Sequence, residues 1–211
     1  MKERPILFSS PMVRAILDGR KTQTRRVVKT DILAHSGLAY VGHDHKQIVM
    51  RGLRSGNEFE FKNPYGVPDD RLWVREALRQ EYTTGDPDTP NGCLATYHAD
   101  GNVVFRDGRP AAYEWERDVL PSMFMPRWAC RIVLEVTGVR VERVQDIVYG
   151  DVLAEGIEVP DGGMMHDARH LFRQLWDSIN AKHGYGWDAN PWVWALAFVE
   201  VEGMAAVPDS V

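Results

Sequence analysis

The chain has 211 residues, of which 44% are hydrophobic and 26% charged, and its formal net charge is −5 at pH 7. This length suits one hydrophobic core, and no run approaches the roughly 20 apolar residues that span a bilayer. The N-terminus MKERPILF lacks a signal-peptide core, and the two cysteines lack metal-ligand spacing. We therefore expect a cytoplasmic protein with no membrane partner, no cofactor and no metal.

Positive charge is concentrated near the N-terminus. Residues 1–30 hold eight Lys or Arg and two acidic residues, a local charge of +6 in a chain whose total is −5. Proteins that coat long nucleic acids usually have a broad basic face and a high pI. The charge pattern therefore favours a small pocket for one phosphate, nucleoside or nucleotide over a long groove.

The first predicted element is a short helix that begins at Ser10. Ser10 is a favourable N-cap, and Pro11 suits the first helical position because its missing N–H would be unpaired there anyway. Gly19 can adopt the left-handed conformation that ends a helix. Met12, Ala15 and Ile16 recur at the spacing of one helical face, which predicts that this face is buried.

A basic, hydroxyl-rich turn follows the helix over residues 20–26. If the turn curls, Lys21 and Thr24 can present an amine and a hydroxyl together. Burial or a neighbouring cation would lower the pKa of the lysine towards neutrality and make it a usable base. The alternative is an exposed basic turn with no chemical role.

Residues 30–118 carry weaker patterns. Strands near Leu38–Val41 and Gln47–Met50 predict a peripheral hairpin, and Arg71–Leu78 predicts one strand. The segment Gln80–Asp118 is rich in turn-forming residues and predicts an excursion with a hairpin around Asp100 and Gly101. His43 and His45 lack a third nearby ligand, so we predict no metal there.

The C-terminal half has the most regular pattern. Alternation predicts strands over 132–136 and 139–142 and a final strand over Val193–Val201. A short helix should begin at Asp146 as N-cap and end at Gly156. A longer amphipathic helix should run from Asp167 to Lys182, with a buried stripe of Leu171, Leu175 and Ile179 that Phe172 and Trp176 widen. Residues 203–211 form a loose tail.

Glu155 is expected at the C-terminal end of the short helix. The negative end of the helix dipole and partial burial both disfavour the carboxylate, and a carboxylic acid held partly protonated can serve as a general acid. The alternative is an exposed residue at a frayed helix end.

Five further polar or aromatic side chains lie in or beside the predicted strands. In the predicted strand 71–78, Trp73 is one of the residues expected to be buried, and Arg75 and Glu76 are polar and could form a surface ion pair. Arg127 and Trp128 lie just before the predicted strand that begins at residue 132. An aromatic ring there could stack on a base or fill the core.

These patterns resemble those of a known family. The helix followed by GRKTxTRR is similar to the opening of ASCH domains, which belong to the PUA-like group of small RNA-associated β-barrels. Three other stretches strengthen the resemblance, and the ending GWDANPWVW (186–194) is similar to phage and prophage ASCH proteins. They are RLWVRE (71–76), PRWACRIVLEV (126–136) and LAEGI (153–157).

The resemblance implies an α+β fold. We expect a PUA-like small β-barrel with two or three packed helices and a peripheral hairpin insertion. Residues 1–202 would form one domain with insertions around 30–70 and 80–118.

The resemblance also implies an activity. Some bacterial ASCH enzymes remove the acetyl group from N4-acetylcytidine, using a Lys as proton acceptor, a Thr as nucleophile and a Glu as proton donor. Lys21 and Thr24 match the first two by motif, and Glu155 in LAEGI is the best match for the third. The residues expected to bind substrate are Arg20, Thr22, Arg25, Arg26, Trp73, Arg75, Glu76, Arg127 and Trp128.

Other functions remain open at this point. The same cleft could belong to a non-catalytic module that binds RNA or a modified nucleotide, with basic residues holding phosphate and a tryptophan stacking a base. An ASCH-type ribonuclease and an accessory phage protein are further alternatives.

Overall fold

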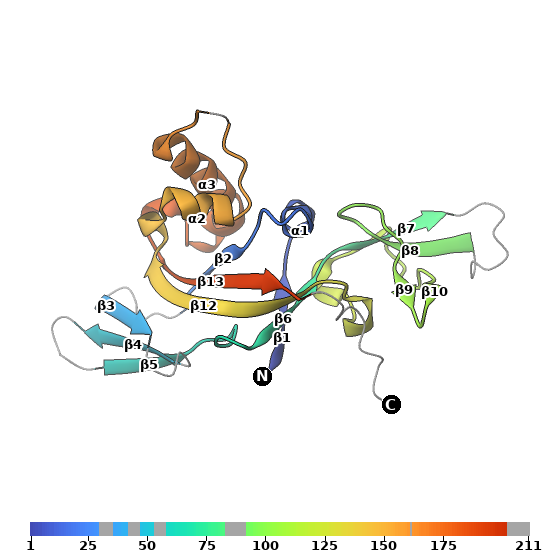
Figure 1. The fold of residues 1–211 in the computed structure, drawn as a ribbon, viewed down its shortest axis with the longest axis horizontal. Helices are drawn as coiled ribbons and strands as arrows, with labels where there is room; N and C mark the ends of the chain where they lie inside the picture. The colour runs from blue at the N-terminus through green and yellow to red at the C-terminus, as the bar shows by residue number, and fades with distance from the viewer. Residues whose placement is uncertain (30–35, 42–46, 53–57, 83–91, 161, 202–211) are drawn as a thin grey trace. The chain divides into compact units, whose positions relative to one another are not determined.

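The computed structural model describes residues 1–29, 36–41, 47–52, 58–82, 92–160 and 162–201. It has an α+β fold with more strand than helix, in agreement with the expected class (Figure 1). The chain divides into two compact units. Unit 1 comprises Met1–Leu17, Arg71–Glu135 and Glu200–Val211, and unit 2 comprises Asp18–Asp70 and Val136–Val199.

Unit 1 contains a parallel strand pair with an antiparallel neighbour. Strand β1 (Glu3–Leu7) pairs in parallel with β6 (Arg71–Arg75), and β6 pairs antiparallel with the first residues of β12 (Val133–Arg143). Leu72 and Val74 alternate with half-buried residues along β6 and are at most 1% exposed. This alternation is typical of a strand with one face in the core.

A second sheet of unit 1 carries most of the long insertion. Strand β7 (Leu78–Tyr82) lies between β8 (Cys93–Tyr97) and β11 (Val119–Leu120), with both pairings antiparallel. The short strands β9 (Phe105–Arg106) and β10 (Arg109–Pro110) form a separate hairpin. A core cluster that includes Leu78, Tyr97 and Met125 joins these strands to the 3-10 turns η3 (Ser122–Phe124) and η4 (Arg127–Ala129).

Helix α1 (Ser10–Leu17) confirms the first predicted helix. Its predicted N-cap is wrong, because Ser10 is the first helical residue and its hydroxyl bonds His98 Nδ1 at 2.9 Å, while the Val13 N–H donates to the Ser9 carbonyl oxygen. The buried residues of α1 are Val13, Ala15 and Ile16, so the predicted face is correct apart from Met12, which is only half-buried. Gly19 follows the helix with φ of +70°, as the end signal predicted. Arg14 on the opposite face donates a hydrogen bond to the carbonyl oxygen of Ala99 at 2.6 Å.

The sheet of unit 2 is built from three antiparallel segments. Strand β13 (Trp192–Glu200) lies between β2 (Gln23–Val27) and the part of β12 after Glu135, and the register pairs Leu196 with Thr24. Unit 2 also holds an antiparallel sheet of β3 (Ser36–Val41), β4 (Gln47–Gly52) and β5 (Glu58–Lys62). The first two of these strands were predicted as a hairpin, and β5 was not predicted.

The helices of unit 2 are α2 (Tyr149–Ala154) and α3 (Met165–Asn180), which contact each other (Figure 1). Shorter 3-10 turns accompany them: η5 (Val144–Asp146), η6 (Ala181–His183) and η7 (Trp187–Ala189). Phe172 and Trp176 of α3 pack with Trp187, Val144 and Val152 to form the core of this unit.

Some predicted details are wrong. Asp146 does not cap the short helix, because its carboxylate accepts the Arg143 N–H in η5 and Val148 is the N-cap of α2. In α3 the buried stripe is Ala168, Phe172 and Trp176, and Ile179 is 42% exposed. Phe172 and Trp176, predicted to widen the stripe, are therefore at the centre of the buried face, Leu171 and Leu175 are half-buried, and the prediction is wrong for Ile179.

The predicted strand Arg71–Leu78 is two strands. β6 ends at Arg75, and β7 begins at Leu78 in a different sheet. None of the sheets formed by the described strands closes into a barrel, because each has two edge strands. The predicted single domain remains a prediction, and its tail at 203–211 lies outside the described residues.

No helix within the described ranges is long and apolar enough to cross a membrane.

Candidate active site

Backbone pairing in unit 2 joins the turn after α1 to the end of α2. The Thr22 N–H donates to the Ala154 carbonyl oxygen at 2.8 Å, and Lys21 forms an isolated antiparallel bridge with Glu155. Phe198 of β13 donates its N–H to the Thr22 carbonyl oxygen at 2.9 Å. Glu155 is the C-cap of α2, and Gly156 follows with φ of +82°. The predicted end of this helix is therefore confirmed.

The Lys21 side chain is enclosed by acceptors. Its Nζ donates to the Glu155 carboxylate at 2.8 Å, to the Glu155 carbonyl oxygen at 2.9 Å and to the Gln23 carbonyl oxygen at 2.8 Å. The side chain of Lys21 is 0% exposed and that of Glu155 is 5% exposed. An ammonium group has three protons, and these three acceptors can receive all of them. The alternative of an exposed basic turn is therefore wrong for Lys21.

Arg25 extends this pair into a network. Its guanidinium contacts the Glu155 carboxylate at 3.2 Å, the Asp151 carboxylate at 2.8 Å and the Glu142 carboxylate at 2.6 Å. It also donates to the side-chain oxygen of Gln23 at 2.7 Å. The Arg25 side chain is 1% exposed, so it acts as a buried cationic link between three carboxylates.

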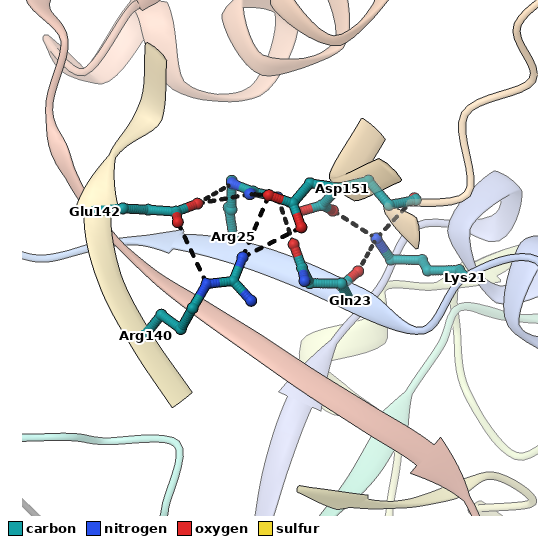
Figure 2. A network of polar contacts seen from close by, with 7 residues as sticks. Lys21, Gln23, Arg25, Arg140, Glu142 and Asp151 are labelled. Atoms are coloured by element: carbon teal, nitrogen blue, oxygen red, sulfur yellow. Dashed lines mark hydrogen bonds and ion pairs between the residues drawn. The ribbon is translucent and has the colours of Figure 1, made fainter. Parts of the chain in front are cut away.

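The outer edge of the network belongs to β12. Figure 2 shows Arg140 and Glu142 projecting from this strand, with Arg25 between Glu142 and Asp151. Arg140 is half exposed and contacts both Glu142, at 3.4 Å, and Asp151, at 3.2 Å. The network drawn in Figure 2 thus extends from a fully buried lysine to a solvent-exposed arginine.

Thr24 lies inside the same segment. It is 3% exposed and stands directly after Gln23, whose carbonyl oxygen accepts a proton of Lys21. It lies on β2, which places a hydroxyl in the segment that carries both Lys21 and Arg25. Because Lys21, Thr24 and Glu155 are all buried, a substrate reaches them only after neighbouring side chains move.

The environment shifts several pKa values. Burial lowers the pKa of Lys21, and Arg26 and Arg25 act in the same direction, although the Glu155 carboxylate raises it. Burial also lowers the pKa of Arg26 and raises that of Tyr65. For Asp151, burial alone would raise the pKa, but Arg25 and Arg140 reverse the effect and hold it below the ordinary value. The surroundings therefore favour the neutral form of Lys21 and the ionised form of Asp151.

The contact between Lys21 and Glu155 is a route along which a proton could pass. A hydrogen bond of 2.8 Å joins the two groups. Transfer of one proton across it would convert an ammonium and a carboxylate into a neutral amine and a carboxylic acid, with no change in total charge. A neutral amine can accept a proton and a carboxylic acid can donate one.

The other predicted ligand residues of unit 2 surround this cluster. Arg20 is half-buried, donates to the Gly156 carbonyl oxygen at 3.1 Å and pairs with Asp18 at 2.7 Å. Thr22 is exposed, and Arg26 is half-buried on β2 beside Arg25. Arg25 was predicted as a substrate contact and is instead occupied by carboxylates of the protein itself.

The remaining predicted ligand residues belong to unit 1, where two of them flank a third. The guanidinium groups of Arg75 and Arg127 lie 5.1 and 5.6 Å from the ring centre of Trp73. Arg75 also donates to the Met125 carbonyl oxygen at 3.0 Å. Arg127 forms a two-bond contact with Glu3, at 3.0 Å for each bond.

Glu76 and Trp128 have different surroundings. Glu76 is 1% exposed and is held by Arg131 through two hydrogen bonds of 2.8 Å. It therefore does not form a surface ion pair with Arg75. Trp128 packs partly against the core of unit 1 and carries the Arg106 guanidinium 4.9 Å from its ring centre.

Sequence reasoning missed the carboxylates around Arg25. Asp151 precedes Glu155 by four residues, a spacing that puts two side chains on one helical face, and this signal was available. Glu142 and Arg140 alternate with buried valines, but alternation says only that they point to the other face of β12.

Within the described ranges, no group of three His, Cys, Asp or Glu is arranged to hold a metal ion. His43 and His45 lie outside those ranges. Comparison of the chain with family models, curated proteins and solved structures finds no match.

Proposed function

We propose that this protein is an ASCH-type amidohydrolase of the PUA-like group that removes an acyl group from the exocyclic amine of a modified cytidine, with N4-acetylcytidine as the model substrate. The single observation that carries the proposal is the contact between Lys21 and Glu155. These residues are 134 positions apart in the chain and were selected from separate motifs, yet their side chains form a hydrogen bond of 2.8 Å.

The chemistry assigned to each residue begins with the transfer of a proton from Lys21 to Glu155 across their hydrogen bond. After proton transfer to Glu155, neutral Lys21 accepts the proton of the Thr24 hydroxyl. The Thr24 oxygen then attacks the acyl carbonyl, and Glu155 donates its proton to the departing exocyclic amine. The acyl group is left as an ester on Thr24, and water hydrolyses that ester to release the acid and regenerate the hydroxyl. No charged group outside the pair has to gain or lose a proton.

The surrounding residues support this assignment through their charges. Burial lowers the pKa of Lys21 against the opposing effect of the Glu155 carboxylate, and Arg26 and Arg25 add to the lowering, which favours the neutral base. Arg20 and Thr22 flank the pair at the half-buried and exposed positions, where they can contact a nucleoside or the phosphate of a nucleotide or RNA.

The experiment is to incubate N4-acetylcytidine with purified protein and to separate the products by chromatography. We expect cytidine from the wild type and a loss of roughly 10²–10⁴ in rate for Lys21→Ala, the range typical of a positioned proton acceptor. Lys182→Ala is the matched control, because it removes an exposed lysine of the same unit. We expect this control to retain the wild-type rate.

Folding has to be separated from chemistry because Lys21 is buried. Circular dichroism and a thermal melt of each variant establish that it is folded at the assay temperature. Thr24→Ser keeps a hydroxyl nucleophile and should keep measurable activity, whereas Thr24→Val removes it and should not. Absence of cytidine from the wild type, or equal rates in Thr24→Ser and Thr24→Val, would contradict the proposed amidohydrolase activity. The non-catalytic binding module or the ribonuclease would then be the better-supported function.

A further inference from the structure

Unit 1 contains a hollow that lies outside the Lys21 cluster. Its volume is about 470 Å³, within the range of pockets that bind small ligands. The residues that line it come from the β9–β10 hairpin, the segment directly after it and η4. They are Arg106, Asp107, Arg109, Pro110, Ala111, Ala112, Glu114 and Trp128.

The hollow combines small side chains with planar ones. Ala111 is buried and Ala112 is half-buried, so the chain after β10 contributes little bulk. Trp128 supplies an indole ring, and the Arg106 guanidinium lies 4.9 Å from its centre. Aromatic rings and guanidinium planes are the two surfaces on which proteins stack unpaired bases. A flat ring system therefore suits the interior of this hollow.

The rim carries charges of both signs. Arg109, Asp107 and Glu114 are exposed. A guanidinium recognises phosphate through two parallel hydrogen bonds. A carboxylate accepts hydrogen bonds from an exocyclic amine such as N4 of cytosine. The rim can thus receive both ends of one ligand that has a phosphate and an amino-bearing ring.

We propose that this hollow binds a nucleotide whose base carries an exocyclic amine. The base stacks on the Arg106 guanidinium that lies over the Trp128 ring, the phosphate pairs with Arg109, and Glu114 accepts a hydrogen bond from the amine. The nucleotide is either free or part of single-stranded RNA. This site is separate from the proposed amidohydrolase site, since none of its lining residues belongs to unit 2.

Calorimetric titration tests the proposal with four probes: cytidine 5′-monophosphate, uridine 5′-monophosphate, cytidine and inorganic phosphate. We expect the wild type to bind cytidine monophosphate more tightly than the other three. Arg109→Gln should weaken this binding roughly tenfold or more, as expected for the loss of a charge-assisted contact. Arg117→Gln is the matched control, because Arg117 is an exposed arginine of the same unit outside the hollow, and it should bind as the wild type does.

Two more variants test the base contacts. Trp128→Leu should weaken binding roughly 5- to 100-fold, the range for loss of one stacked base. Glu114→Ala should remove the preference for cytidine over uridine monophosphate. Trp128 also packs against the core, so the exposed Arg109 and Glu114 variants keep the proposal falsifiable if Trp128→Leu does not fold.

The remaining outcomes distinguish a free nucleotide from single-stranded RNA or overturn the proposed binding site. If hexacytidylate binds more tightly than the mononucleotide and both are lost in Arg109→Gln, the occupant is single-stranded RNA; equal affinities indicate a free nucleotide. Failure of the wild type to bind either one overturns the proposal. So does binding that survives Arg109→Gln and Glu114→Ala but is lost in Lys21→Ala, a result that would instead favour the amidohydrolase site.

Discussion

Lys21 and Glu155 are joined by a backbone bridge and by a buried side-chain contact of 2.8 Å, and Lys21 Nζ also donates to the Glu155 carbonyl oxygen at 2.9 Å. The bridge supports the side-chain contact, because it fixes the positions from which the side chains extend. The two residues do not depend on each other equally. Glu155 also contacts the Arg25 guanidinium at 3.2 Å, whereas Lys21 also donates to neutral carbonyl oxygens, those of Gln23 and Glu155.

This asymmetry predicts unequal losses of stability. Removing one partner of a buried ion pair typically costs about 3–5 kcal/mol. We expect Glu155→Leu to fall in this range, because it leaves two buried cations with one carboxylate fewer, and Lys21→Met to cost less, because Arg25 still neutralises Glu155. The double variant should cost less than the two single changes together.

Urea denaturation of the four proteins at pH 7 measures these free energies of unfolding. Lys182→Met, at an exposed position, serves as the control and should stay within about 0.5 kcal/mol of the wild type. A larger loss in Lys21→Met than in Glu155→Leu would contradict the assigned role of Arg25.

The lowered pKa of Asp151 predicts how the stability of the protein changes as the pH falls. Burial raises its pKa, but Arg25 and Arg140 lower it by more, so the folded-state pKa lies below the unfolded-state value of about 3.9. A depressed carboxyl pKa stabilises the fold above the unfolded-state pKa, and this contribution disappears as pH falls through the folded-state pKa. Asp151→Asn should therefore cost about 1–3 kcal/mol at pH 7, the range for a hydrogen bond to a charged group.

The measurement is the free energy of unfolding of both proteins between pH 3 and 7. We expect the difference between them to stay constant above about pH 5 and to shrink below about pH 4. Glu158→Gln alters an exposed carboxyl group, 78% exposed at its side chain, and should show only a small difference throughout. A difference that widens on acidification would rule out the sign assigned to Asp151.

Local signals in the sequence were enough for part of the fold. Gly19 marked the end of α1, because a positive φ depends on the residue itself. Ser10 located the start of the helix, although its hydroxyl bonds His98 and does not cap. The division between β6 and β7 was not visible. Leu72, Val74, Glu76 and Leu78 are all at most 1% exposed, so the two-residue period of burial continues across the break, and alternation predicts one strand.

The candidate site divides in the same way. The motif around Lys21 and the helix end at Glu155 could be selected from the sequence, and the structure brings these two together. The link through Arg25 to Glu142 could not be foreseen, because it depends on how β12, which carries Glu142, is placed in the sheet on the far side of β13 from β2. The hollow beside Trp128 was equally hidden, since Arg109 and Glu114 are ordinary exposed residues of a turn-rich segment.

Two arginines of unit 1 allow a prediction of how burial affects the contribution of an ion pair to the free energy of unfolding. Arg131 and Arg127 each hold a carboxylate through two hydrogen bonds, at 2.8 Å to Glu76 and at 3.0 Å to Glu3. The carboxylates differ in exposure, with side-chain values of 1% for Glu76 and 36% for Glu3. Arg131 also contacts Asp100 at 2.7 Å and lies 3.8 Å from the centre of the Tyr97 ring.

We expect Arg131→Lys to cost about 3 kcal/mol or more, because an ammonium cannot make the two-bond contact or cover the ring, and the buried Glu76 charge is left poorly compensated. Arg127→Lys should cost less than about 1 kcal/mol, as is usual for exposed pairs. Chemical denaturation of both variants compares them directly. Similar losses in the two would show that burial does not set the strength of these contacts.

Two glycines of unit 2 predict opposite effects of the same substitution. A Cβ atom at Gly19 or at Gly150 would meet no atom within 4 Å, so neither change to alanine creates a clash. Gly19 has φ of +70°, a conformation that costs an L-residue about 1–2 kcal/mol, whereas Gly150 lies within α2. Gly19→Ala should therefore destabilise the protein. Gly150→Ala should stabilise it by about 0.4–1 kcal/mol, because alanine has less conformational freedom to lose on folding.

Thermal denaturation followed by circular dichroism separates these two outcomes. For a chain of this size, 1 kcal/mol corresponds to a shift of roughly 2–4 °C in Tm. We expect Tm to fall in Gly19→Ala, to rise in Gly150→Ala and to change by nearly compensating amounts in the double variant, since a Cβ atom at either position meets no atom within 4 Å. A rise in Tm for Gly19→Ala would mean that the chain leaves α1 without the left-handed residue, and the position of Lys21 after it would then need another cause.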